Sequence, residues 1–316
     1  MFALRGIAVS LTFFVLVYCL LSTLVAVAWR SPRYLHAPEK SVAAFLFGLR
    51  VFPFAASVVV TLAFVVPSFQ LLEPRSIEID EGIGAMPLAF GIFALLLIAC
   101  GCWRVIAAQA KTSRVVARWM EGAHPLEGSA SEDKAVTLRS RPEAPPLTLV
   151  GLRKARVLVS ETTVALLSDA ELQIALKHEL AHVQSRDNLK KLIFRFCPYP
   201  GMAQLESAWS QTAELAADDA AVSKVEDAVD LAAALVKLSR LVPREPAPVC
   251  TVGFVTGSIR VRVARLLAWG EAGKTQVVQI RPWHVVLPLL VTLVCVFATY
   301  GPALALTHVI TEWLVR

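Results

Sequence analysis

The chain has 316 residues, of which 56% are hydrophobic and 18% are charged, and its net charge is +6. Soluble domains average about 25% charged residues, so this composition excludes a disordered or collagen-like chain and argues against an ordinary soluble globule. At roughly 100–200 residues per domain, the length accommodates a membrane part and one soluble domain.

Four long stretches without a formal charge carry most of the apolar residues. A membrane-spanning helix needs about 20 such residues, and in lipid every backbone polar group must be satisfied within the chain. We therefore predict three transmembrane helices in residues 1–103 and a fourth, followed by a short tail, in residues 282–316. An apolar soluble core is the alternative for these stretches, and a cleaved signal peptide is the alternative for the first one. The stretches cover about 6–29, 51–72, 82–103 and 282–311.

Charged residues near these stretches predict the orientation of the chain. Basic residues are frequent between the first two stretches and at both ends of the segment 104–281. Residues 73–81 are mainly acidic. Because basic loops stay on the cytoplasmic side, we expect residues 104–281 to form a cytoplasmic domain, with the N- and C-termini outside. We expect an integral protein of a bacterial inner or plasma membrane. The lipid bilayer is then a partner, and topology accounts for the positive charge without a nucleic acid partner.

Residues 104–281 begin with a mixed pattern. Residues 104–120 predict a helix that leaves the membrane, and residues 121–146 are rich in glycine, proline and serine, which predicts a loop. Two short apolar runs, Leu147–Val150 and Ala155–Val159, predict a hairpin. The first run is either an edge strand that binds substrate by strand addition or an inner strand.

Three helices follow. Ser168 and Glu171 match a capping box, so we expect a helix from there to about Arg186. Two more helices are predicted at about 202–222 and 226–241. Residues 258–269 alternate basic and apolar side chains, which fits either a helix on the membrane surface or an ordinary packing helix.

The first of these helices carries the motif His178-Glu179-Leu180-Ala181-His182. Histidines four residues apart share one face of a helix, so both imidazoles can bind one metal ion. Glu179 lies between them and can take a proton from a metal-bound water. This is the zinc-binding pattern of metalloproteases, and we predict zinc as the cofactor and Glu179 as the catalytic base. A chance match and a structural pair of core histidines are the alternatives.

A catalytic zinc usually has a third protein ligand. We predict Glu214, because Glu214 and Asp218 lie one helical turn apart among small residues that let their helix approach the first one closely. Asp218 would accept the free N–H of a ligand histidine. A solvated acidic patch is the alternative, and Asp187 follows the first helix too closely to be expected to fold back. The candidates considered are His124, Asp187, Glu206, Glu214, Asp218 and Asp219.

These motifs resemble those of the gluzincin membrane metallopeptidases. The resemblance rests on the sequences at 178–182 (HELAH), 186–188 (RDN) and 214–219 (ELAADD). The beta-lactam-sensor antirepressor peptidases (BlaR/MecR type) are most similar, and the HtpX and CaaX prenyl-protease family is the near alternative. The resemblance implies a mainly α fold, in which an α+β zincin-like metallopeptidase domain is inserted among four transmembrane helices.

The resemblance also implies zinc ligands at His178, His182 and Glu214, with Glu179 catalytic and Asp218 supporting. Only five residues follow Thr311, so we expect the sensor domain to be lacking.

The function expected from these residues is that of a membrane-embedded zinc endopeptidase. Its substrate would be a cytoplasmic or membrane-proximal protein, with a regulator as one candidate. A membrane quality-control protease, a non-cleaving regulatory protein with a zinc-binding domain, and a structural membrane protein with a chance motif are the alternatives. The sequence predicts neither the substrate nor the oligomeric state.

Overall fold

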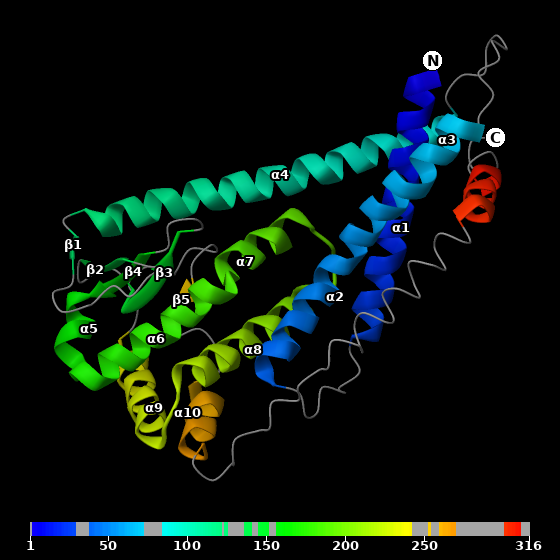
Figure 1. Cartoon of the computed structure of the whole chain (residues 1–316). Coiled ribbons are helices and arrows are strands. Elements are labelled where there is room, and N and C mark those ends of the chain that lie inside the picture. Colours follow the sequence, from blue (N-terminus) through cyan, green and yellow to red (C-terminus); the bar gives the residue numbers. More distant parts are fainter. Residues whose placement is uncertain are drawn as a thin grey trace. The chain divides into compact units, whose positions relative to one another are not determined.

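The computed structural model describes the residues shown as coloured ribbon in Figure 1. These fall into two compact units. One contains residues 1–31, 51–100 and 276–316, and the other contains residues 32–50 and 101–275. The described residues are 2–29, 38–72, 84–121, 123–125, 136–140, 145–151, 156–241, 252–253, 259–269 and 300–310.

Three helical segments of the described residues are long and apolar enough to cross a membrane. They are α1 (Phe2–Ala28), the run formed by α2 (Glu39–Val60), the π-helical turn η1 (Thr61–Val65) and α3 (Val66–Leu72), and α4 (Ala85–Met120). The first three predicted stretches are thus helical. Of the fourth, residues 282–299 lie outside the described residues and residues 300–310 are helical.

Two helices extend beyond the predicted apolar stretches. The second segment begins at Glu39, before the stretch at 51–72, and α4 continues without a break to Met120, which agrees with the helix predicted for residues 104–120. The charge pattern indicates where a helix meets water and not where the helix begins.

Hydroxyl side chains in the apolar helices bond to their own helix. Thr12 donates to the carbonyl of Ala8 at 2.8 Å, and Ser57 donates to the carbonyl of Pro53 at 2.6 Å. This bonding to the preceding turn satisfies a hydroxyl without water, as a lipid environment requires.

The second unit contains one small sheet with the strand order β1-β2-β4-β3-β5. Strands β3 and β4 pair antiparallel, which confirms the predicted hairpin. Because β5 pairs with the other side of β3 at Thr148 and Leu149, β3 is an inner strand rather than an edge strand. The strands are β1 (His124–Pro125), β2 (Val136–Ser140), β3 (Leu147–Val150), β4 (Arg156–Ser160) and β5 (Val252–Gly253).

The predicted loop at 121–146 was wrong in two places, since β1 and β2 lie within it. Strand β2 pairs in parallel with β4, for example Thr137 with Val157. Strand β3 separates β2 from its partner β4 in the chain. The composition of the residues around β2 therefore could not predict this pairing.

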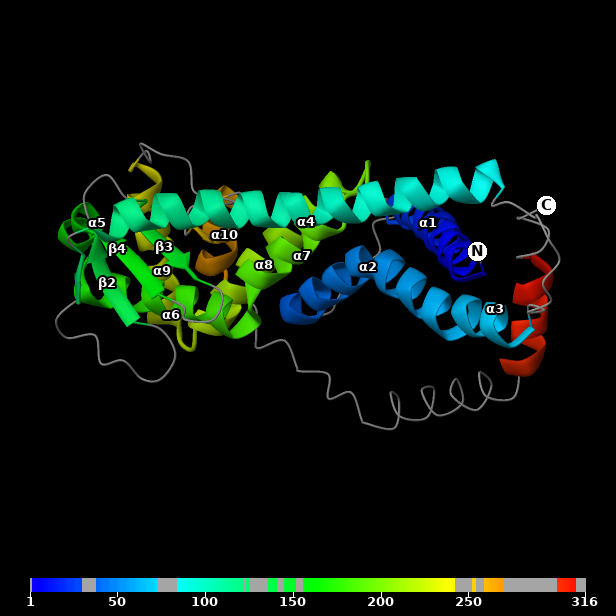
Figure 2. The same cartoon turned by 90° about the horizontal axis from the view of Figure 1, so that it is seen from above.

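Helices cover both faces of the sheet (Figures 1 and 2). Val150 and Leu158 pack with Trp119 at the end of α4. The alternate residues Leu149 and Val157 belong to the main core on the opposite face, with side chains from α6 and α9. This alternation is the period of two expected for a strand covered on both sides.

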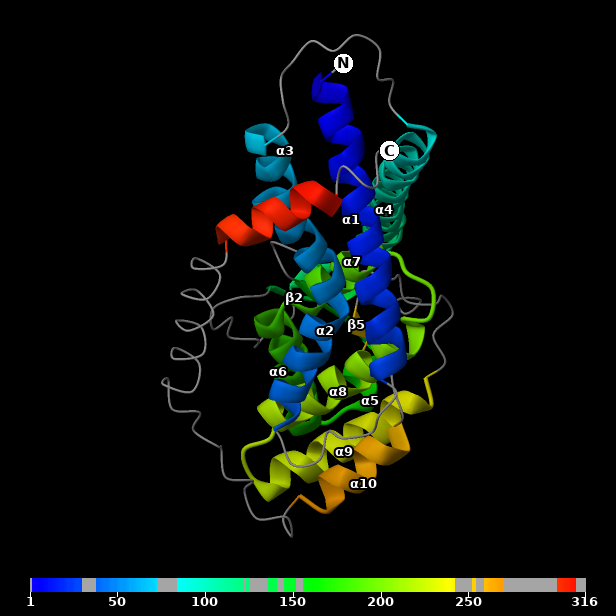
Figure 3. The same cartoon turned by 90° about the vertical axis from the view of Figure 1, so that its right-hand side faces the viewer.

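In the described part of the second unit six helices follow the hairpin; α6, α8, α9 and α10 correspond to predicted helices, and α5 and α7 do not. Helix α6 begins with the predicted capping box, in which Ser168 Oγ accepts from the backbone N–H of Glu171 at 3.3 Å and a Glu171 oxygen accepts from the N–H of Ser168 at 2.8 Å. Helices α9 and α10 lie side by side (Figure 3). The helices are α5 (Glu161–Leu166), α6 (Asp169–Ser185), α7 (Asp187–Phe196), α8 (Ala203–Ala221), α9 (Val225–Ser239) and α10 (Ile259–Leu267).

Helix α7 was not predicted. It begins directly after Arg186, which ends α6 with a left-handed backbone (φ 55°). This residue turns the chain between two helices without a separate loop, so the charged and polar residues at 186–191 form the first turns of a helix.

Candidate metal centre

The buried face of α6 presents the motif residues to the interior. His178 and Glu179 are 0% exposed and His182 is 1% exposed. The two Nε2 atoms of the histidines lie 3.2 Å apart. Two nitrogens bonded to one tetrahedral zinc at about 2.0–2.1 Å lie about 3.3 Å apart. The helix therefore holds the imidazoles at the spacing that a shared metal ion requires.

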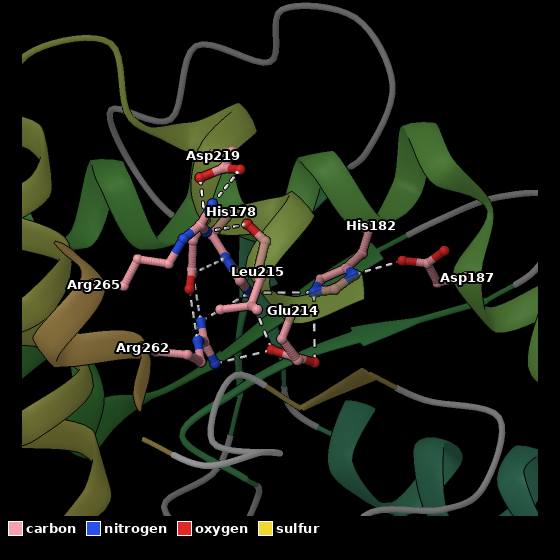
Figure 4. Close-up of polar contacts among 9 residues, drawn as sticks. His178, His182, Asp187, Glu214, Leu215, Asp219, Arg262 and Arg265 are labelled. Atoms are coloured by element: carbon pink, nitrogen blue, oxygen red, sulfur yellow. Dashed lines mark hydrogen bonds and ion pairs between the residues drawn. The ribbon is translucent and has the colours of Figure 1, made fainter. Parts of the chain in front are cut away.

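Helix α8 brings Glu214 to the same point (Figure 4). Its Oε2 lies 3.6 Å from Nε2 of His178, and its Oε1 lies 3.8 Å from Nε2 of His182. One ligand atom from each of these three residues lies within 4.8 Å of the others. Buried alanines on α8, including Ala213 and Ala217, leave room for the close approach of the two helices. Glu214 is only 3% exposed, which excludes the solvated acidic patch.

Each of the two imidazoles also has a carboxylate close to its Nδ1 atom. Nδ1 of His178 lies 3.0 Å from Oδ1 of Asp218, and Nδ1 of His182 lies 2.7 Å from Oδ2 of Asp187. A carboxylate hydrogen-bonded to Nδ1 keeps the proton on that nitrogen and leaves the lone pair of Nε2 for a metal ion. His182 makes this hydrogen bond with Asp187, and His178 lies at ion-pair distance from Asp218.

Asp187 is thus close to the site, contrary to the expectation that it could not fold back. It does so as the partner of a histidine, because the left-handed Arg186 reverses the chain immediately before it. The sequence feature that could have predicted this contact is the short acidic side chain of Asp187, directly after the end of the motif helix.

Sequence reasoning missed Arg262, a buried residue of α10 that is 2% exposed. Its Nε and Nη2 donate to the two oxygens of Asp218 at 2.8 and 2.6 Å, and its Nη1 donates to Oε2 of Glu214 at 2.9 Å. Helix α10 packs with α9 and buries Arg262 and Leu266, so the packing-helix alternative is correct. Arg262 lies four residues before the apolar Leu266, and a basic residue on the buried face was the available signal.

Among the residues that the structure describes, the buried carboxylates near the site outnumber the lysine and arginine side chains that contact them. The carboxylates of Glu179, Asp187, Glu214 and Asp218 are all buried. Within the described residues they are contacted by Arg262 and by Lys190, whose Nζ lies 3.0 Å from Oδ1 of Asp187. With Glu179 ionised and both histidines neutral, as metal binding requires, two negative charges remain, which one divalent cation would balance. Buried charges require such compensation.

Glu179 supplies a second indication of a bound group. Among the residues that the structure describes, neither oxygen of its fully buried carboxylate has a hydrogen-bond partner. Burial raises the pKa of Glu179. A carboxylate left in this state inside the protein fits a metal-bound water or substrate group at the same place. Together, the donor set and the charge fit a divalent metal ion.

The local electrostatics also favour a cation. Burial alone lowers the pKa of His178, but its contacts with Asp218 and Glu214 outweigh burial and raise the pKa to about 9. Burial raises the pKa of Asp218, but contacts with His178 and Arg262 outweigh it and lower the pKa to about 2. The carboxylates therefore stabilise positive charge at this position, whether it is a proton or a metal ion.

The other carboxylates and the histidine considered as ligands lie elsewhere. His124 is exposed in β1. Glu206 pairs with Arg50 at 2.8 Å, and Asp219 pairs with Arg265 at 2.9 Å. Within the described part of the chain, only His178, His182 and Glu214 form a group that could hold a metal ion.

A histidine pair with an intervening glutamate, completed by a carboxylate from a second helix, defines a candidate metallopeptidase centre, here in a chain with three helices able to cross a membrane. The chain belongs to peptidase family M48, whose family model matches residues 147–311. The matched segment contains β3 to β5 and α5 to α10, and so every residue of the candidate centre.

Peptidases of this family are metal-dependent. The match supports a gluzincin-type metallopeptidase and is compatible with both resemblances found in the sequence. No curated protein matches the chain significantly.

Proposed function

We propose that this protein is a membrane-embedded zinc endopeptidase that hydrolyses peptide bonds of a cytoplasmic or membrane-proximal protein. The observation that carries the proposal is the convergence of His178, His182 and Glu214 beside the buried carboxylate of Glu179. Histidine and carboxylate ligands with one position left open are typical of catalytic zinc.

His178, His182 and Glu214 would hold the zinc ion. When bound, zinc lowers the pKa of a coordinated water and polarises the carbonyl of the scissile bond. Glu179 is the general base: its carboxylate takes the proton of the attacking water and then gives it to the leaving amine. The raised pKa of Glu179 suits both roles, because a carboxylate that returns the proton must hold it in between.

Asp187 and Asp218 orient the imidazoles during this cycle. Both contact Nδ1 of their histidine, at 2.7 and 3.0 Å. Each keeps its ring in the tautomer that leaves Nε2 for the metal. Neither is expected to touch the substrate.

A regulatory protein is one candidate substrate, by analogy with the BlaR/MecR-type peptidases that the sequence motifs resemble. In the proposed topology, residues 104–281 are cytoplasmic, both termini lie outside, and the fourth apolar stretch spans the membrane. The positive-inside distribution of charge supports this arrangement. Labelling of single cysteines placed in residues 73–81 and 121–135 tests this topology. A membrane-impermeant reagent added to intact cells should modify a cysteine in residues 73–81 and not one in residues 121–135.

Comparison of protein fragments in cells that express the wild type or the Glu179→Gln variant tests the proposed activity. Fragments that disappear only in the variant would identify substrates, and the exposed Glu226→Gln on α9 serves as the matched control. Identical fragment sets, with zinc bound in both proteins, would support a non-cleaving regulatory protein instead. Absence of bound metal in the purified wild type would contradict the metal centre itself.

A further inference from the structure

The guanidinium of Arg262 joins two acidic residues of the candidate centre. It comes from α10, whereas Asp218 and Glu214 come from α8 and the histidines from α6. Its ion pairs with both carboxylates are formed by side chains that are at most 3% exposed. Hydrogen bonds at a buried site are not weakened by solvent. The guanidinium can therefore fix the positions of the carboxylates that it contacts.

Arg262 holds the Asp218 carboxylate in one plane. Its Nε and Nη2 donate to the two different oxygens of Asp218 at 2.8 and 2.6 Å. This paired geometry is specific to the planar fork of arginine. The oxygen that accepts from Nη2, Oδ1, is also the one that lies 3.0 Å from Nδ1 of His178. Arg262 therefore fixes the atom that orients His178.

Arg262 also distinguishes the two oxygens of Glu214. Its Nη1 donates to Oε2 at 2.9 Å, and this oxygen lies 3.6 Å from Nε2 of His178. The other oxygen, Oε1, lies 3.8 Å from Nε2 of His182. An oxygen that accepts a charged hydrogen bond is a poorer metal ligand, since its electron density is shared with the guanidinium.

We propose that Arg262 is a positioning residue of the metal centre, which orients His178 through Asp218 and makes Glu214 bind the metal through a single oxygen. The inference rests on the proposed metal centre and adds to it the control of coordination number. A one-oxygen carboxylate leaves the fourth position of a tetrahedral ion open for water and substrate. A two-oxygen carboxylate would occupy that position.

The same two helices offer a matched control. Arg265 lies one turn after Arg262 on α10, and it pairs with both oxygens of Asp219, the neighbour of Asp218, at 2.9 Å each. The side chains of Arg265 and Asp219 are 37% and 39% exposed, and they lie outside the metal-binding group. Arg265→Met thus removes an arginine–aspartate pair between the same helices without touching the centre.

The test measures the affinity of the purified full-length protein for Zn²⁺, by competition with a chelator, and the visible spectrum of the Co²⁺-loaded protein. Absorption by Co²⁺ is stronger in four-coordinate than in five-coordinate sites, so the spectrum reports the binding mode of Glu214. We expect Arg262→Met to weaken Zn²⁺ binding about 10–100-fold and to lower the Co²⁺ absorption per metal ion. Arg265→Met should change neither.

Arg262→Lys distinguishes positioning from charge alone. Lysine keeps the positive charge but lacks the planar fork, so we expect it to leave the Co²⁺ absorption lowered. If the lysine variant matches the wild type in both affinity and spectrum, or if Arg262→Met matches Arg265→Met in both, the proposal is overturned.

Two further measurements distinguish the possible causes of an effect on Zn²⁺ binding. Should Arg262→Met fail to fold, as judged by its circular dichroism, the lysine variant carries the test. If the effect on Zn²⁺ affinity acts through Asp218, the double variant Asp218→Asn/Arg262→Met should bind Zn²⁺ about as weakly as Arg262→Met alone, because the two residues then act as one unit; additive losses would contradict this route. A wild type that binds no metal would instead contradict the proposed function.

Discussion

Nδ1 of His182 lies 2.7 Å from Oδ2 of Asp187, although the two residues belong to successive helices and only Arg186 separates the helices. The contact gives the second histidine of the motif the same kind of carboxylate partner that Asp218 gives the first. Both aspartates are buried, so solvent cannot replace them.

Replacing Asp187 by asparagine should therefore weaken metal binding. Loss of a carboxylate behind a ligand histidine typically lowers metal affinity 10–100-fold, and we expect a decrease in this range for Asp187→Asn. Metal affinity by chelator competition is the measurement, with Asp230→Asn on α9 as the control. An affinity equal to that of the control would show that the contact does not orient His182.

Removal of the metal should destabilise the protein. The buried carboxylates around the site then keep only the compensating charges of Arg262 and Lys190 among the described lysine and arginine side chains. A ligand present at 1,000 times its Kd stabilises a fold by about 4 kcal/mol, which corresponds to about 8–16 °C in Tm for a unit of this size. Thermal unfolding with and without a chelator measures the difference. His178→Ala, which lacks a ligand, should show little further decrease on addition of the chelator.

The capping box of α6 should contribute to stability by itself. Ser168 accepts from the N–H of Glu171 at 3.3 Å, and loss of such a cap costs about 1 kcal/mol. We expect Ser168→Ala to lower the free energy of unfolding by about this amount, measured in denaturant. Ser168→Thr keeps the hydroxyl and should retain most of the stability; equal losses in both variants would mean that the hydroxyl bond is not the cause.

Glu171 should make part of this stability depend on pH. Burial raises its pKa, but hydrogen bonds from Lys237, at 2.7 Å, and from the N–H of Ser168 outweigh burial and lower the pKa below 4.5. A group whose pKa is lower in the folded state stabilises the fold above its unfolded pKa, and this contribution is lost as the pH falls through the folded pKa. The stability difference between wild type and Glu171→Gln should therefore be largest near pH 7 and shrink at pH 3.5. A difference that is constant between these two pH values would contradict the prediction.

Two glycines should respond in opposite ways to replacement by alanine. A Cβ at Gly101 of α4 would collide with the backbone carbonyl of Phe196, whereas nothing lies within 4 Å of a Cβ at Gly48 of α2. We expect Gly101→Ala to cost about 1–3 kcal/mol through overpacking. Gly48→Ala should be neutral or stabilise by up to about 1 kcal/mol, since alanine favours the helix. Thermal unfolding of the two variants tests the contrast.

Local patterns in the sequence were sufficient for the parts of the fold that depend on neighbouring residues. The capped start of α6, the hairpin of β3 and β4 and the bounds of α8 follow from residues a few positions apart. The motif on α6 likewise predicted the histidine pair, because helical spacing alone brings His178 and His182 together. The continuation of α4 to Met120 agrees with the helix predicted at 104–120, whereas the start of α2 at Glu39 did not follow, since an apolar helix can extend beyond its uncharged stretch.

The sequence predicted the roles of Glu214 and Asp218 only in part. Their spacing indicated that they share a helix face, but several acidic residues had similar patterns, and only the packing of α8 on α6 places Glu214 within reach of both histidines. The same packing separates Glu206 and Asp219 from the centre and pairs them with arginines.

The sequence by itself thus determined the peptidase motif, the apolar helices and the class of chemistry, because each of these is a periodic arrangement of nearby residues. The tertiary structure alone decided which acid lies beside the two histidines, that Asp187 contacts His182, and that Arg262 donates to both Asp218 and Glu214. These contacts join residues as far apart as 214 and 262, and their geometry depends on how α6, α7, α8 and α10 pack around one buried charge cluster.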